Sequence, residues 1–180
     1  MPLEVITIFL LFHIAVPLII FEIPQIKNKF KIHRLALIIG SVFPDILDKS
    51  ILFLGLGAGR GFAHSLLIVF LSFFLLSLLT RGNYSISIPF LIGNLFHLLL
   101  DLPGVPVFWP FIIYDFHILD DPIGSWLTTL FTNPIIMSTE LIGLLIFIFI
   151  MFNNKLYTIH TIIDFLTTSD QNRIDDNTNN

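Results

Sequence analysis

Five long runs of hydrophobic residues follow one another along the chain, and short segments with most of the charged residues separate them. The runs are Leu3–Ile23, Leu35–Leu56, Phe62–Thr80, Ile86–Leu102 and Ile135–Phe152. A helix needs about 20 apolar residues to cross the hydrocarbon core of a bilayer, and each run comes near that length. The pattern therefore predicts an all-α fold, a polytopic membrane helix bundle with about five spans.

The second run is the least regular, because Pro44 is followed there by Asp45 and Asp48. Proline removes a backbone donor from a helix interior, so it breaks or kinks the helix. Non-helical backbone at membrane depth is tolerated only where it is buried in protein or lines a wet cavity. We therefore expect a broken span or a re-entrant pair of half-helices here, with the Pro44 segment facing inward.

The composition agrees with a membrane protein whose main partner is the lipid bilayer. The 180 residues are 55% hydrophobic and 12% charged, with a mean hydropathy of +0.90. A soluble domain of this length could not bury so much apolar surface. The only basic cluster, within 27–34, resembles a membrane-flanking loop, so we expect no nucleic-acid partner. The sequence does not indicate an oligomeric state.

The distribution of Lys and Arg predicts the orientation of a multi-pass protein in the cell membrane. These residues favour the cytoplasmic side. Placing 25–34 there also places Arg81 and Lys155 inside, whereas the segment 103–133, which has no Lys or Arg, falls outside. The N-terminus is then outside and the C-terminus inside.

Three regions follow from this reading of the chain. Residues 1–155 are expected to form a transmembrane domain, and 156–168 an amphipathic segment at the membrane interface. The tail, 169–180, is rich in Asn and Asp and is expected to be disordered.

Ionisable side chains within the apolar runs are the main indication of function. They are costly at membrane depth, and usually face a protein interior or a watery cavity. Here they are His13, Asp45, Asp48, His64, His97, Asp101 and Glu140. The chain has no cysteine, so any metal ion would be held by His nitrogen and carboxylate oxygen.

Two spacings favour metal binding, and each has a structural alternative. His97 and Asp101 are four apart and share one helix face, which suits two ligands or an Asp that orients a His. A buried His–Asp hydrogen bond is the alternative, and His160 with Asp164 repeats the spacing as an interfacial surface feature. Two ionised carboxylates three apart, as at 45 and 48, repel unless a cation compensates. Their alternative is a solvated turn partnered by Lys49.

The residues around His64 add an anion-binding candidate. Arg60 is a rigid donor group that suits a phosphate oxyanion, or else it extends its charge to the membrane interface. Ser65 suits hydrogen bonding at a helix N-terminus. By the predicted topology, His64 and Asp101 lie at the outer ends of their runs and Glu140 in the outer third of its own. We therefore expect one pocket that opens toward the outer leaflet.

The order of these motifs resembles the inner-membrane-associated, metal-dependent hydrolase family (YdjM-like, also described as LexA-regulated hydrolases). The resemblance covers about residues 8–150. The matching pieces are His13, Gly40 with 44–48, 60–65, 93–101, Gly104-Val105 with 109–111, and Glu140. The family's His-Arg-Gly-x-Thr-His-Ser run has Gly59 and Ala63 here in place of its first His and its Thr. The scattered His and Asp are also similar to zinc-dependent phospholipase C and related single-strand nucleases.

The leading hypothesis is a metal-dependent hydrolase that cleaves a phosphoester or other ester in an amphiphilic substrate such as a phospholipid. The expected cofactor is a divalent metal ion, zinc above others, and its expected ligands are His13, Asp45, Asp48, His64, His97 and Asp101. Asp48 or Glu140 would accept the proton of a metal-activated water, and Arg60 would stabilise developing negative charge. The alternatives are a transporter or ion-binding protein that uses the same cluster, and a non-catalytic family member that lacks the His at position 59.

Overall fold

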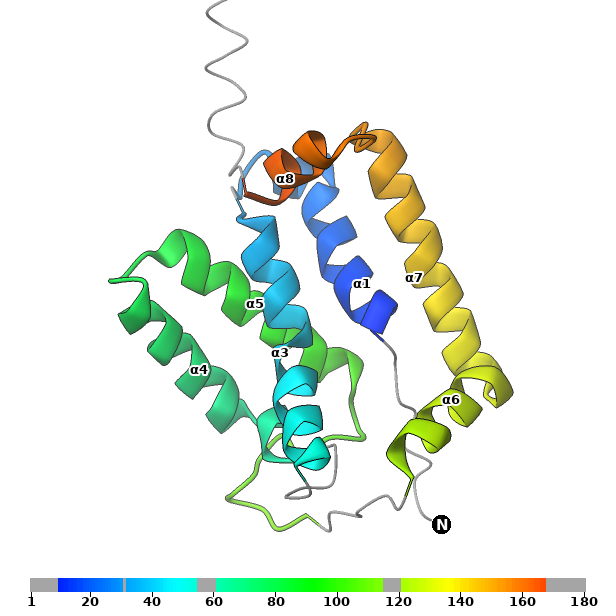
Figure 1. The fold of residues 1–180 in the computed structure, drawn as a ribbon. Helices are drawn as coiled ribbons and strands as arrows, with labels where there is room; N and C mark the ends of the chain where they lie inside the picture. The colour runs from blue at the N-terminus through cyan, green and yellow to red at the C-terminus, as the bar shows by residue number, and fades with distance from the viewer. Residues whose placement is uncertain (1–9, 31, 55–60, 115–120, 168–180) are drawn as a thin grey trace, which may run out of the picture.

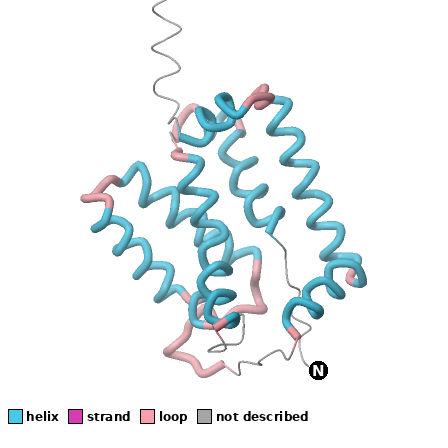
Figure 2. The backbone as a smooth tube through the Cα atoms, in the orientation of Figure 1, coloured by secondary structure: helices cyan, strands magenta, loops and turns pink. Residues whose placement is uncertain are grey.

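The computed structural model describes residues 10–30, 32–54, 61–114 and 121–167, which are helical with no strand among them. The elements are α1 (Leu10–Glu22), α2 (Pro24–Lys27), α3 (Arg34–Phe53), the 3-10 turn η1 (Phe62–His64), α4 (Leu66–Leu79), α5 (Tyr84–Leu100), α6 (Pro122–Thr132), α7 (Pro134–Asn153) and α8 (Ile159–Thr167). Figures 1 and 2 show their arrangement, with a long irregular segment over 101–114 after α5. The all-α prediction is confirmed for these residues.

Five longer helices pack side by side in the order α4, α5, α3, α1, α7 (Figure 1). Along the chain, successive members of this set run in opposite directions, as in an up-and-down bundle. The short helix α8 lies across the end where α3 begins and α7 finishes, and α6 lies at the other end. The bundle therefore has two distinct ends, one covered by α8 and the other next to α6.

Helices α3 and α5 approach each other closely because glycines face each other across their contact. A Cβ on Gly40 would meet the Phe90 backbone, and a Cβ on Gly93 would meet the carbonyl oxygen of Leu37. Small residues at such crossings let two backbones touch, as is typical of helix packing in membranes. This contact sets the distance between the polar residues of the two helices.

Pro44 lies inside α3, which continues from Arg34 to Phe53 without interruption. The prediction of a broken or re-entrant segment is therefore wrong. The physical reason is that a proline inside a helix removes one hydrogen bond, to the carbonyl of the residue four positions earlier, Gly40. The extensive packing of α3 against α5 and α1 stabilises the rest of the helix.

By length and composition, α7 is the one helix in the described part of the chain that could cross a membrane unaided. The apolar helices α1, α4 and α5 are shorter, and α3 has 20 residues but carries several charges. Large apolar side chains are exposed on two of the outer helices, such as Phe74 and Leu78 of α4 and Phe149 of α7. Apolar surface of this extent marks an interaction with a membrane or a partner.

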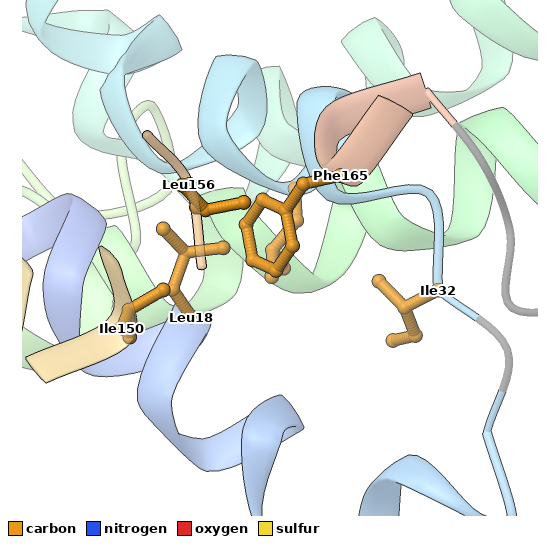
Figure 3. Packing of buried hydrophobic residues seen from close by; sticks show 6 residues of the cluster. Leu18, Ile32, Ile150, Leu156 and Phe165 are labelled. Atoms are coloured by element: carbon orange, nitrogen blue, oxygen red, sulfur yellow. The ribbon is translucent and has the colours of Figure 1, made fainter. Parts of the chain in front are cut away.

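At the α8 end, a small apolar core ties four segments together. Figure 3 shows one buried cluster made by Leu18 of α1, Ile32 before α3, Ile150 of α7, Leu156 after α7 and Phe165 of α8. Helix α8 falls within the expected segment 156–168. The other pair with the spacing of His97 and Asp101, His160 and Asp164, is exposed there, so its interpretation as a surface feature is confirmed.

A buried ion pair reinforces the same end of the bundle. The Glu22 carboxylate accepts hydrogen bonds from Lys27 Nζ at 2.6 Å and Arg34 Nε at 2.8 Å. Arg34 also donates to the carbonyl oxygen of Phe165 in α8 and stacks on its ring. Arg34, the first residue of α3, therefore anchors α8 and is paired in turn with Glu22 of α1.

Candidate metal centre

Six of the residues singled out in the sequence lie together at the end of the bundle opposite α8. They are His13 of α1, Asp45 and Asp48 of α3, His64 of η1, His97 of α5, and Asp101, the C-cap of α5. None of the six is more than 7% exposed. Buried ionisable groups are costly unless they are paired or hold a metal ion, so this gathering requires an explanation.

Two carboxylate oxygens in this group lie within 4.0 Å of a pair of imidazole Nε2 atoms that face each other. The Nε2 atoms of His64 and His97 are 3.1 Å apart. Asp101 Oδ2 is 3.4 Å from His97 Nε2 and 3.6 Å from His64 Nε2. Asp45 Oδ1 is 3.5 Å from His64 Nε2 and 4.0 Å from His97 Nε2. Bonds of about 2.0–2.1 Å to a tetrahedral ion place donor atoms about 3.3 Å apart. We call these four atoms the four-donor cluster.

The hydrogen bonds behind the two imidazoles fix which nitrogen faces the cluster. His97 Nδ1 lies 2.8 Å from the carbonyl oxygen of Ser41. Because a carbonyl can only accept, we assign the proton to Nδ1. His64 Nδ1 lies 2.6 Å from Asp48 Oδ2 and is assigned in the same way. In the neutral rings both Nε2 lone pairs then point at each other, an arrangement that a cation between them stabilises.

Asp48 supports the cluster from outside it. Oδ2 accepts from the Gly61 N–H at 2.7 Å as well as from His64, and Oδ1 accepts from the Ala63 N–H at 3.2 Å. Both oxygens are therefore engaged in orienting His64 and holding the segment around η1. Carboxylate partners of this kind hold a metal-binding His in position. The sequence predicts Asp48 as a ligand and as a base, whereas the geometry favours an orienting role.

His13 adjoins the cluster through the second oxygen of Asp101. Its Nε2 lies 3.4 Å from Asp101 Oδ1, and its ring is 4.3 Å from the His97 ring between centroids. His13, His97 and Asp101 form one potential metal-binding group, and Asp45, His64 and His97 form another. His97 belongs to both groups and is the central residue of the site.

Glu140 lies beside the site but does not enter it. Its Oε1 accepts from the Phe12 N–H at 3.1 Å and its Oε2 from the Leu11 N–H at 3.3 Å. A carboxylate from α7 thus satisfies backbone donors at the start of α1, where a helix favours negative charge. Because His13 follows directly, Glu140 helps to set its position. The sequence predicts a catalytic role for Glu140, whereas this contact favours a positioning one.

The predictions for Ser65 and Arg60, which flank His64 in the sequence, have different outcomes. Ser65 Oγ accepts from the Ile68 N–H at 3.4 Å as the N-cap of α4, so its interpretation as a helix-terminal residue is confirmed. Helix α4 consequently begins at Leu66, whereas the third apolar run of the sequence predicts a start at Phe62. Arg60 and the substituted Gly59 lie outside the described residues.

Sequence reasoning missed the contributions of the backbone and of α6. The Ser41 carbonyl and the Gly61 and Ala63 amides take part through main-chain atoms, which no residue type reveals. Over 103–133 the sequence predicts only a loop, yet α6 forms there, with Asp121 accepting from the Gly124 N–H and Pro122 in the first turn. Asp-Pro is a recognisable helix-start signal and could have predicted α6.

Comparison with known proteins identifies the family. The family described as YdjM inner membrane protein matches this chain over residues 9–162. That range contains all six clustered residues and Glu140. No curated protein and no solved structure matches the chain. The similarity to zinc-dependent phospholipase C stays a prediction. The chain thus belongs to the YdjM inner membrane protein family, and its location is a membrane.

Proposed function

We propose that the protein is a membrane-bound, metal-dependent hydrolase that cleaves a phosphoester or other ester in an amphiphilic substrate. The observation that carries this proposal is the convergence, in a buried site, of two imidazole Nε2 atoms that are 3.1 Å apart and two carboxylate oxygens that lie within 4.0 Å of them. Nitrogen and oxygen donors in this number suit Zn²⁺ or a similar divalent ion. A cation would also offset the repulsion among the carboxylates gathered there.

The roles of the chain's own residues follow from their places. His64, His97, Asp45 and Asp101 would hold the ion, which when bound polarises ester groups and activates water at neutral pH. A proton released during hydrolysis needs an acceptor at the edge of the cluster. The His13–Asp101 pair lies there, with 3.4 Å between Nε2 and Oδ1, so we assign it this role.

Metal removal tests the proposed activity directly. Protein purified in detergent and stripped with a chelator is expected to lose about a thousandfold in ester hydrolysis, because a catalytic ion contributes several kcal/mol of transition-state stabilisation. Zn²⁺ should restore the rate. The assay measures product release from phospholipid and from simple phosphate and carboxylate esters.

Two other outcomes would replace the proposal. Metal-dependent ion or solute uptake into proteoliposomes, with no ester hydrolysis, would favour the transporter alternative. If metal-loaded protein shows no hydrolysis and no transport, the result would favour a non-catalytic family member. That alternative comes from Gly59, which stands in place of the family's His.

We further propose that α1, α3, α4, α5 and α7 span the membrane with the N-terminus outside and the C-terminus inside. Two features support this. The alternating helix directions fit five successive crossings (Figure 1). Lys27 and Arg34 gather at the end that holds α8, near Lys155, as expected for a cytoplasmic face. The metal centre would then lie toward the outer leaflet, within reach of lipid-like substrates.

Single cysteines would test this orientation, because the native chain has none. Phe108 is exposed at the end of the bundle that holds the candidate metal site. A cysteine there should react with a membrane-impermeant maleimide on intact cells. Arg81→Cys and Lys155→Cys should react only after permeabilisation. Equal labelling of Lys155→Cys on intact cells would contradict the orientation.

A further inference from the structure

Among the described residues, Lys49 is the basic residue that lies against the four-donor cluster. It is one helical turn beyond Asp45 on α3, and its Nζ donates to Asp45 Oδ2 at 2.6 Å. The other oxygen of the same carboxylate, Oδ1, is the one that belongs to the cluster. A single carboxylate group therefore separates the ammonium from the atoms that would hold the metal ion.

The Asp45–Lys49 pair also forms the accessible side of the site. The side chains of His64, His97 and Asp101 are at most 1% exposed, whereas those of Asp45 and Lys49 are 11% and 34% exposed. In the part of the chain that the structure describes, exposure of the site therefore begins at this pair, and the ammonium group of Lys49 is the more exposed of its two charges.

Trp126 of α6 holds this ammonium from a second direction. Lys49 Nζ lies 5.1 Å from the centre of the Trp126 ring, and that ring packs edge-on against Phe53 at the end of α3. Contact of a cation with an aromatic face is favourable without consuming a hydrogen-bond donor. An ammonium has three donors, and Asp45 engages one of them in the described contacts.

We propose that Lys49, held between Asp45 and Trp126, forms an anion-binding site at the mouth of the metal centre and binds the phosphate group of the substrate. Lysine binds phosphate as a compact point charge, and a donor placed beside a divalent ion can share the same phosphate oxygens. The site narrows the substrate from esters in general to phosphate-bearing amphiphiles. It rests on the proposed function, since the metal centre defines its position.

The alternative is that Lys49 only neutralises Asp45, and variants separate the two. Lys49→Met removes the charge but keeps a long apolar stem, whereas Lys49→Arg keeps the charge. Lys29→Met, an exposed lysine in the loop before α3, serves as the matched control. Zinc-loaded protein in detergent is titrated with inorganic phosphate by calorimetry, and bound zinc is measured by elemental analysis.

We expect Lys49→Met to weaken phosphate binding at least about tenfold, as befits the loss of a charge-assisted hydrogen bond, while zinc content stays at the native level. Lys49→Arg should retain most of the affinity, and Lys29→Met all of it. Trp126→Ala should weaken binding more than Trp126→Phe, which keeps an aromatic face.

Three results would overturn this assignment. They are native phosphate affinity in Lys49→Met, loss of zinc from that variant, and absence of phosphate binding by the native protein. Failure of the proposed function looks different, because the native protein would then bind no zinc, or would bind zinc without hydrolysing any ester. Phosphate titration of the native protein and of Lys49→Met still measures in either case whether the ammonium binds the anion.

Discussion

Replacing His97 and Asp101 together with alanine is expected to reduce bound metal from about one ion per chain to less than about a tenth of that value, and hydrolysis with it. The variant removes two of the four donors. It also removes the residue common to both potential metal-binding groups. The two remaining donors, from His64 and Asp45, cannot complete a tetrahedral site. Elemental analysis of purified protein measures the change.

The chain supplies a matched control for this experiment. His160 and Asp164 have the same spacing on a helix, with 2.9 Å between their charged atoms, but their side chains are 86% and 47% exposed. Replacing that pair with alanine should leave metal content unchanged. Asp101→Asn keeps the shape of the buried side chain, so a loss of metal with native thermal unfolding would separate ligand loss from misfolding. Unchanged stoichiometry in His97→Ala plus Asp101→Ala would refute the ligand assignment.

The sequence could predict which residues gather, because ionisable side chains within apolar helices usually face the protein interior or a watery cavity. The spacing of His97 and Asp101 predicts that both point one way, and the structure confirms it with 3.4 Å between them. Spacing could not separate Asp45 from Asp48. Both lie on the inward side of α3. Only the position of η1 decides that Asp48 accepts hydrogen bonds from the backbone N–H groups of Gly61 and Ala63.

The helix boundaries were predictable in outline and failed where tertiary contacts override local preference. Pro44 has the local signature of a break, yet packing against α5 and α1 keeps α3 continuous. The apolar run from Phe62 has a helical composition throughout. Its first residues instead form the 3-10 turn that places His64 over Asp48, and Ser65 then starts α4. In both places the departure from the sequence pattern falls beside the four-donor cluster, as is common at functional sites.

The contact between α3 and α5 should be as sensitive to substitution as the proposed metal ligands. A Cβ at position 93 would lie against the Leu37 carbonyl oxygen, 2.6 Å from Ser41 N and 3.0 Å from Gly40 C. All of these are backbone atoms, so no side-chain rotation can relieve the overlap. The helices would have to move apart, and the Ser41 carbonyl that orients His97, 2.8 Å away, would move with α3.

Gly93→Val is therefore expected to lower the free energy of unfolding by about 3 kcal/mol or more, at the upper end for overpacked positions, and to abolish metal binding. Thermal unfolding in detergent and elemental analysis measure the two effects. The control is Gly82→Asn, in the turn after α4. Gly82 has a φ of 77° and no neighbour within 4 Å of an added Cβ, and Asn tolerates that backbone conformation. Native metal content in a destabilised Gly93→Val protein would show that His97 does not depend on this helix contact. A native unfolding temperature would show that the two backbones are not in contact.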